Sequence, residues 1–188
     1  MAFSISDFYS RLSGDGARPN LFQVFMTIPG IVSQSMPAGQ DIQSATTEFS
    51  FMCRTAQLPG SSVGSVVVPY FGREIKLAGN RVFQDWTVTI VNDEDFLIRN
   101  TFEAWMNTLN SHIFNRRAPG ALAPINYQTN GRVVQYGKEG FQIKSYNFTG
   151  MFPIDVSPID VDWGSNDTIE EFTVTFQYQY WTSSSTVR

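Results

Sequence analysis

The sequence predicts a mainly β fold, a β-sandwich or barrel with one flanking helix and several long loops. Between Phe172 and Tyr180, apolar or aromatic residues occupy every second position and alternate with threonine and glutamine. Side chains of a strand point alternately to its two faces, so this segment is predicted to be a long strand with one buried face. Similar alternation recurs in shorter segments, whereas only one segment repeats its apolar residues at helical spacing.

The other strands are predicted from the same alternation. It indicates four of them, at residues 22–28, 49–53, 75–77 and 86–90. Residues 141–152 also alternate, but Phe141 and Ile143 occupy one phase and the aromatic residues from Tyr146 onward occupy the other. Because a slip of one residue reverses the two faces of a strand, we expect a bulge or bend near Ser145.

One helix is predicted, at about residues 92–110. Asn92 is a suitable N-cap, and the three acidic residues after it lie where the helix dipole favours negative charge. A single apolar stripe follows at helical spacing: Ile98, Phe102, Trp105, Met106 and Leu109. We expect this stripe to pack on the sheet and cap its core.

The 188 residues suit a single domain, 1–188, which begins with an N-terminal arm at 1–16. Long loops are expected at 29–47 and 111–131, where proline, glycine and small polar residues interrupt any periodicity. Residues 58–72 are also expected to be an irregular connection, although they contain several valines and aromatic residues. Such apolar side chains need cover, either from their own domain or from a neighbouring molecule.

Charged residues are scarce, at 16% of the chain, against about 25% in an average soluble domain. A surface with few charges favours association, so we expect much of it to be hidden against partners. The formal net charge is −4, and the largest basic cluster is the pair Arg116–Arg117. Sequence-independent binding to nucleic acid needs more clustered lysine and arginine than this.

The stretch from Ser145 to Val187 contains no lysine or arginine. Its acidic residues are Asp155, Asp160, Asp162, Asp167, Glu170 and Glu171. Two interpretations remain open for them. They form either an ordinary solvated acidic loop or a surface that repels a polyanion.

Histidine and cysteine, two residue types that often carry catalysis, occur once each. His112 is the only histidine and follows the predicted helix end, where an imidazole is ordinary. Cys53 is the only cysteine and falls on an apolar strand position, so we expect a buried thiol and no internal disulfide. No leader peptide and no membrane-spanning run is predicted.

Residues 160–171 resemble an EF-hand calcium loop in part. Asp160, Asp162 and Glu171 match its first, third and twelfth positions, but Ser165 replaces the glycine required at the sixth. The first two carboxylates also suit a glycosidase, yet no aromatic cleft is indicated around them. We therefore expect no enzymatic activity, no metal site and no cofactor.

Four segments, taken together, resemble the tail tube proteins of T4-like contractile-tailed bacteriophages. They are ARPNLFQV at 17–24, FMCRTAQLPG at 51–60, FGREIKLAGNRVFQDWTVTIVND at 71–93, and the closing block at 150–181 that begins GMFPIDVSPIDV. The third is the most specific, because it joins a short strand, an A-G-N-R turn and a D-W-T-V-T strand. The loops at 29–47 and 111–131 depart from the family pattern.

The resemblance implies a structural subunit of the virion, made in the host cytoplasm, which assembles into six-membered rings. In that family the strands of each ring form a continuous barrel, and rings stack into a hollow tube inside a contractile sheath. Implied partners are further copies of the chain, the sheath protein, a baseplate or tube initiator, and a tail terminator. The tape-measure protein and DNA are implied to occupy the lumen without specific binding, and no membrane is involved. The acidic stretch then becomes a candidate for a lumen surface along which DNA slides.

Two groups of residues are candidates for packing between subunits. They are Phe3 and Phe8 in the arm, and Val66, Val67, Val68, Tyr70 and Phe71 in the connection. Within the same class, a tube initiator, a baseplate protein or the inner tube of a secretion system would have a similar sequence. From another class, a monomeric β-sandwich carbohydrate-binding module remains the alternative, because its polar faces also carry threonine and glutamine.

Overall fold

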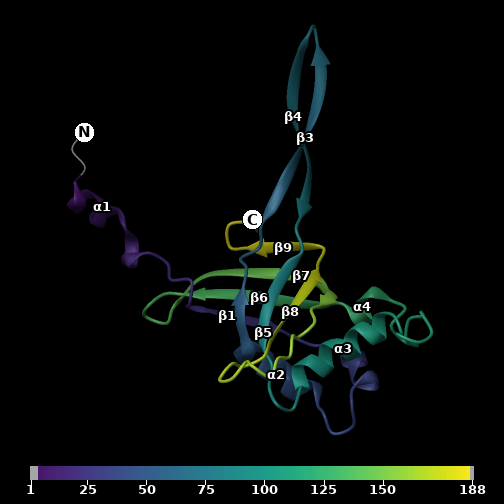
Figure 1. Cartoon of the computed structure of the whole chain (residues 1–188). Helices are drawn as coiled ribbons and strands as arrows, with labels where there is room; N and C mark the ends of the chain where they lie inside the picture. Colours follow the sequence, from purple (N-terminus) through teal and green to yellow (C-terminus); the bar gives the residue numbers. More distant parts are fainter. Residues whose placement is uncertain (1–3, 187–188) are drawn as a thin grey trace.

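The computed structural model describes residues 4–186 (Figure 1). The body is an antiparallel sheet in the order β1-β6-β7-β8-β5-β2, with β9 paired to β7, and the separate hairpin β3–β4 projects from it. The strands are β1 (Phe22–Met26), β2 (Cys53–Ala56), β3 (Ser61–Tyr70), β4 (Arg73–Phe83), β5 (Trp86–Val91), β6 (Thr129–Tyr136), β7 (Gln142–Val156), β8 (Glu171–Gln177) and β9 (Tyr180–Ser183). The helical segments are α1 (Ile5–Arg11), η1 (Ser13–Asp15), η2 (Gly30–Ser35), α2 (Ile42–Met52), α3 (Leu97–Leu109) and α4 (Pro124–Tyr127). The predicted mainly β class is confirmed.

Strand β7 joins the two halves of the sheet. Its first part pairs with β6 and β9, and its last part pairs with β8. Between these parts Gly150 has a φ of 68°, a left-handed conformation that glycine adopts readily. Phe148 and Met151 are both buried although they lie three positions apart, so the buried face changes phase here. The bulge predicted near Ser145 is confirmed, because the register passes from the pair Gln135–Lys144 to the pair Tyr136–Gln142 and leaves Ile143 as an extra residue of β7. The phase change at Gly150 is a second irregularity, which was not predicted.

The core lies where the sheet packs against α2 and α3. The predicted alternation is confirmed by a buried ladder between β5 and β8, formed by Trp86–Phe176, Val88–Val174 and Ile90–Phe172. The Phe102 ring of α3 lies 5.7 Å from the Phe176 ring and 5.8 Å from the Phe49 ring of α2. The last strand is shorter than predicted, because β8 ends at Gln177 and β9 begins only at Tyr180.

Helix α3 confirms the predicted apolar stripe but not the predicted start. Three residues of the stripe are fully packed inside: Ile98, Phe102 and Trp105. The helix begins at Leu97, whose backbone N–H donates to Asp95 Oδ1 at 2.9 Å, and Phe96 with a φ of 55° occupies the N-cap position. Asn92 is not the cap; it is buried, and its side-chain amide donates to Glu170 Oε2 at 2.9 Å.

The prediction of a single helix is wrong, because α1, α2 and α4 are also present. Helix α2 lies across the predicted loop 29–47 and the predicted strand 49–53. The Asp41 carboxylate caps it by accepting two backbone N–H groups of its first turn. Phe49 is buried against the core while Phe51 is exposed, so the spacing that resembled a strand belongs to a helix face. No helix within residues 4–186 is long and apolar enough to cross a membrane.

Two expected loops contain strands. Most of residues 58–72 form β3, and the short strand predicted at 75–77 is part of β4. Pro69 is tolerated because each strand of a two-stranded ribbon has a free edge. The loop predicted at 111–131 is interrupted by α4 and ends in β6, where Gly131 and two adjacent buried valines hide the alternation.

Candidate functional site

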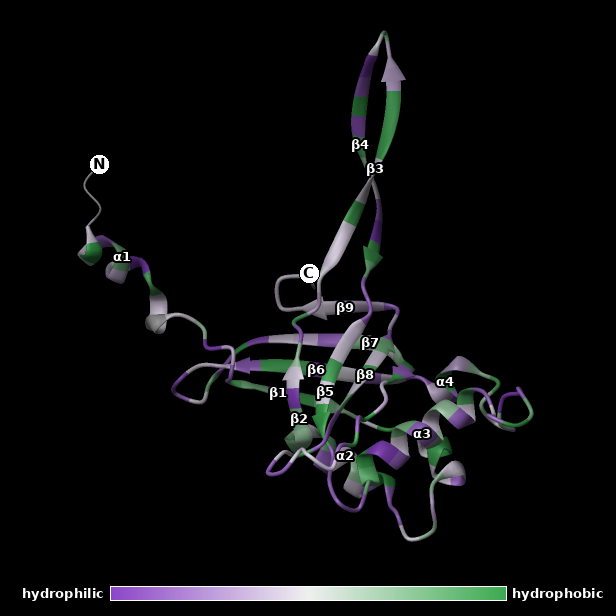
Figure 2. Cartoon of the chain, viewed as in Figure 1, coloured by the Kyte–Doolittle hydropathy of each residue, from purple (hydrophilic) through white to green (hydrophobic). Residues whose placement is uncertain are grey.

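The β3–β4 hairpin exposes a large apolar surface away from the body. It stands out as an isolated ribbon in Figure 1, and both of its strands carry hydrophobic stretches in Figure 2. Its exposed large apolar side chains are Val63, Val66, Val67, Val68, Tyr70, Phe71, Ile75, Leu77 and Val82. A contiguous surface of this kind is typical of an interaction site. Five of the residues predicted for packing between subunits therefore lie together on the hairpin.

The register of the hairpin divides its side chains between two faces, because directly opposite residues share a face. One face, here called the apolar face, carries the pairs Val66–Leu77 and Val68–Ile75. The other, here called the charged face, carries Val67 opposite Lys76 and Pro69 opposite Glu74. Alternation along β3 thus places Val66 and Val68 on the apolar face and Val67 on the charged face.

An extra residue on β4 interrupts the ladder of the hairpin. The register passes from the pair Val63–Arg81 to the pair Ser65–Ala78. From the first pair to the second, the chain advances two residues along β3 but three along β4. The additional residue of β4 forms a β-bulge at Gly79 and its neighbour.

This bulge keeps the apolar face continuous. It places Val82 on the same face as Leu77, although the two lie five positions apart along β4. It also brings the two backbones close together, since a Cβ atom on Gly79 would lie 3.1 Å from the carbonyl carbon and oxygen of Gly64. Figure 1 shows the two strands crossing within the ribbon. The glycine pair therefore permits a close crossing that larger residues would obstruct.

The base of the hairpin is fixed to the body by two tryptophans. The Trp181 indole donates to the carbonyl oxygen of Gly60 at 3.1 Å, and the Trp86 indole donates to that of Gln57 at 2.7 Å. The Phe83 ring meets the Trp181 ring edge to face at 6.4 Å. The apolar outer part of the ribbon consequently projects from an ordered base.

The N-terminal arm forms a second exposed apolar element. Helix α1 has no buried residue, and Ile5, Phe8 and Tyr9 are all exposed. Figure 1 shows α1 well apart from the hairpin, so the structure does not bring Phe8 together with the valines of β3. Phe3, the other candidate in the arm, lies outside the described residues.

Four of the six acidic candidates lie in the loop 157–170, with Glu170 as its last residue. Asp160, Asp162 and Asp167 are all exposed, and Trp163 among them is fully exposed. Asp162 Oδ1 accepts the backbone N–H of Gly164 at 3.0 Å, which closes a turn. The loop connects two strands and has no flanking helices, so the EF-hand arrangement considered from the sequence is not formed.

The remaining two acidic candidates, Asp155 and Glu171, lie on the strands that flank this loop. Asp155 is exposed on β7. Glu170 accepts the hydrogen bond from Asn92, and Glu171 forms an ion pair with Arg54. A hydrogen bond or an ion pair thus engages three of the six carboxylates: Asp162, Glu170 and Glu171.

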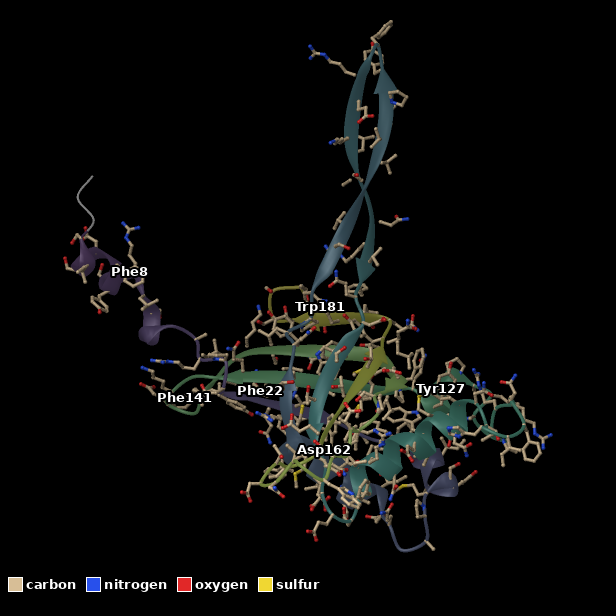
Figure 3. The ribbon with its side chains drawn as sticks, viewed as in Figure 1. Phe8, Phe22, Tyr127, Phe141, Asp162 and Trp181 are labelled. Atoms are coloured by element: carbon tan, nitrogen blue, oxygen red, sulfur yellow. The ribbon has the colours of Figure 1, made fainter. Side chains whose placement is uncertain are left out.

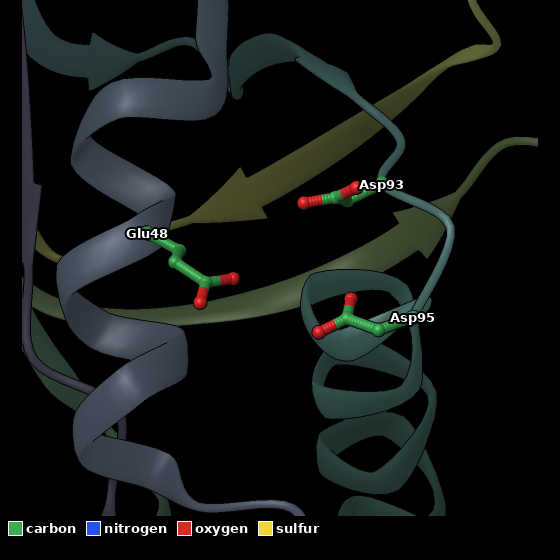
Figure 4. Close-up of side chains that lie close together, drawn as sticks. All are labelled: Glu48, Asp93 and Asp95. Carbon is green, nitrogen blue, oxygen red and sulfur yellow. The ribbon is translucent and has the colours of Figure 1, made fainter.

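A carboxylate cluster that the sequence analysis missed lies between α2 and the start of α3 (Figure 4). Oxygens of Glu48, Asp93 and Asp95 all lie within 4.8 Å of one another. Burial raises the pKa of Glu48, and the charges of Asp95 and then Asp93 raise it further. One oxygen from each carboxylate gives three ligands, fewer than the six to eight oxygens of a calcium site. The consequence that the geometry supports is therefore mutual repulsion of the three charges. Sequence reasoning missed the cluster because it predicted residue 48 outside any helix.

The two residues singled out for chemistry have ordinary surroundings. His112 is exposed, and its Nδ1 lies 3.1 Å from Asn107 Oδ1. Cys53 is buried at the start of β2, as predicted, and burial raises the pKa of its thiol to about 12. A thiol of this kind stays protonated at neutral pH and is a poor nucleophile.

Comparison with known families decides the identity of the chain. A sequence model of the family described as "Phage tail tube protein" matches residues 17–184. The chain belongs to this family. Among related tail tube proteins, gp19 of Enterobacteria phage T4 is 34% identical over 170 residues, which cover 90% of this chain and 93% of gp19. The tail tube protein of Serratia phage KSP90 is 22% identical over 147 residues, 78% of this chain and 81% of the relative. As a tail tube protein, the chain is a component of the phage virion.

Solved structures with a similar fold come from contractile machines. A chain of the anti-feeding prophage baseplate aligns with a TM-score of 0.61 and 12% identity, over 89% of this tail tube protein and 95% of that chain. A chain of the sheath–tube complex of the extracellular contractile injection system PVC aligns with a TM-score of 0.57 and 14% identity, over 97% and 99%. At these identities the likeness concerns the fold.

Proposed function

We propose that this chain is the repeating structural subunit of a phage tail tube, whose copies form six-membered rings that stack into a hollow conduit for DNA inside a contractile sheath. The observation that carries the proposal is the hairpin, which exposes nine large apolar side chains in a member of the tail tube family. Such a surface is costly to leave in water and becomes stable once another molecule covers it. The role is one of assembly, without catalysis.

Ring closure is proposed to use the free edges of the sheet that contains β7. Strand β1 pairs only with β6 and strand β9 only with β7, so each has an unpaired edge among the described residues. Pairing between the β9 edge of one subunit and the β1 edge of the next would satisfy these backbone groups and close a barrel.

The proposed partners follow from the machines in which similar folds occur. The aligned chains come from a baseplate, a sheath–tube complex, and a tube-terminating cap. We therefore propose contacts with a sheath protein, a baseplate initiator and a terminator. A tape-measure protein and DNA would occupy the lumen without specific binding.

We also propose that exposed acids repel DNA from the conduit wall. Asp155 is the best placed to test this, because it is exposed on a strand of the body. Changing Asp155→Lys should slow DNA delivery by assembled virions, whereas Asp155→Asn should have a smaller effect. Equal delivery by all three proteins would contradict the electrostatic role.

The test of assembly is negative-stain electron microscopy with mass photometry on the purified full chain at high concentration. Rings of uniform width, alone or stacked into hollow tubes, are the expected result. A monomer that binds a glycan would overturn the proposal in favour of a carbohydrate-binding module. Rings that never stack, even on added tube seeds, would favour an initiator or baseplate role over the repeating subunit.

A further inference from the structure

We infer that the hairpin docks through its apolar face alone, onto the acidic end of a second copy of the chain that is stacked head to tail with the first. This inference rests on the proposed function and deepens it by naming the docking face and the surface that receives it.

The two faces of the hairpin differ in what they can bury. The apolar face carries two aliphatic pairs and ends, towards the tip, in Tyr70 opposite Arg73. The charged face carries Lys76 and Glu74 among its residues, and burying these charges unpaired would carry a large desolvation cost. An interface that covers the apolar face and leaves the charged face in water avoids this cost. The bulge at Gly79 supports such use, because it extends the apolar face down to Val82.

The end of the body opposite the hairpin has complementary chemistry. Figure 3 labels Asp162 at this end, away from the projecting ribbon. The loop that contains it, 157–170, exposes Val161, Trp163 and Ile169 as well as its acids. An aromatic anchor with flanking apolar residues is the kind of surface that carries binding energy at an interface.

The charges of these two ends are opposite. The apolar face of the hairpin carries one charged residue, the basic Arg73 near its tip, whereas loop 157–170 contains four acids and no base. Among the described residues, neither Arg73 nor Asp162 forms an ion pair within its own chain. Complementary ends on one molecule make a head-to-tail contact, which generates an open stack when it repeats. A second copy is therefore the occupant that the charge pattern selects.

The first experiment compares two adjacent valines with nearly equal exposure, Val68 at 41% and Val67 at 44%. Val68→Asp changes the apolar face, and Val67→Asp makes the same change on the charged face. Purified full-length variants are examined by sedimentation velocity and electron microscopy without DNA, after a urea unfolding check that each monomer is folded. We expect Val68→Asp to weaken stacking by about tenfold or more while rings persist, and Val67→Asp to stack nearly as wild type.

The second experiment reverses charges at the two ends. Arg73→Glu and Asp162→Arg should each weaken ring stacking, and the double variant should recover most of it. Lys76→Glu is the matched control, because it makes the same charge change on the other face. Stacking of the wild type should also weaken with added salt.

The outcomes separate the inference from the proposed function. Rings that stack equally in Val68→Asp and Val67→Asp, or a double charge variant that recovers nothing, would overturn the inference and leave the tube role intact. A wild type that forms neither rings nor stacks at low salt, with or without tube seeds, would overturn both.

Discussion

The Trp181 indole N–H donates a hydrogen bond to the carbonyl oxygen of Gly60, 121 residues earlier in the chain, across 3.1 Å. This bond joins strand β9 to the first residue before the hairpin. Trp181 also contacts the rings of Phe83 and Tyr146, so one side chain connects the sheet edge to both sides of the ribbon base. The orientation of the ribbon depends on this contact.

Trp181→Phe should loosen the hairpin without unfolding the body. The substitution removes the indole donor and leaves the Gly60 carbonyl without it, while most ring contact remains. We expect a loss of about 0.5–1.5 kcal/mol in the free energy of unfolding. Hydrogen exchange should accelerate in residues 61–83 more than in β5 or β8. Unchanged exchange in the ribbon would show that Trp181 does not fix it.

Gly79→Ala should disturb the ribbon at its crossing. The new Cβ would lie 3.1 Å from backbone atoms of Gly64, which cannot move as a side chain can. Gly64→Ala is the matched control, because its Cβ would meet the Asn80 carbonyl oxygen at an ordinary 3.5 Å. We expect Gly79→Ala to cost about 1–3 kcal/mol locally, measured by exchange protection within the hairpin. Equal effects of both substitutions would contradict the proposed tight crossing.

The sequence predicted the strands whose alternation is not interrupted. In β5 and β8 every second residue is buried against α3, so a period of two is directly visible. Strand β3 of the hairpin was not predicted, because its apolar residues are not buried and no core imposes alternation on them. An alternating pattern reflects the burial of one strand face, and an isolated ribbon buries little of either face.

The errors at α2 and β7 have local causes. Phe51 is exposed yet aromatic, so its spacing from Phe49 imitates a strand. In β7 the alternation predicted the bulge beside Ser145, but the second phase change at Gly150 was missed because Tyr146, Phe148 and Phe152 keep one spacing across it. Exposed aromatic residues such as Phe51 belong to surfaces that the single chain leaves uncovered. Of the candidate site, Val66, Val67, Val68, Tyr70 and Phe71 were singled out from the sequence, but in an irregular connection. Their strand and the division of its faces required the pairing of β3 with β4.

Gly150→Ala should destabilise the junction between the two parts of β7. Its φ of 68° disfavours any residue with a Cβ, and the added atom would lie 2.9 Å from Gln179 Cγ. We expect a loss of about 1–2 kcal/mol in urea unfolding. Gly30→Ala serves as the control, because that glycine has no neighbour within 4 Å and no positive φ. A loss of the same size in the control would show that the left-handed conformation is not responsible.

Glu48→Gln should stabilise the protein near neutral pH. The pKa of Glu48 is raised above its ordinary value of 4.5 in the folded state, so the folded chain binds more protons than the unfolded chain between those two values. Stability is therefore lost as the pH rises through that window, and it stays lower above it. Removing the charge should raise the free energy of unfolding by about 0.2–1 kcal/mol at pH 7, a modest gain because Glu48 is only half-buried. At pH 3 the substitution should leave the free energy of unfolding unchanged.

Thermal or urea unfolding of both proteins at pH 3, 5 and 7 measures this difference. Asp41 caps α2 and lies outside the cluster, so Asp41→Ala should instead be destabilising at pH 7. A destabilised Glu48→Gln at pH 7 would mean that the carboxylate has a favourable partner in solution.

Strands β2 and β5 are hydrogen-bonded neighbours, and the hairpin is simply the connection between them. The topology of the body therefore does not depend on how far this connection extends. Residue pairs can be removed from or added to the outer part of the ribbon, one from each strand, while the order of the sheet stays the same. The length of the ribbon can therefore change independently of the core. A longer or shorter ribbon would alter the axial repeat of an assembly while the core stays the same.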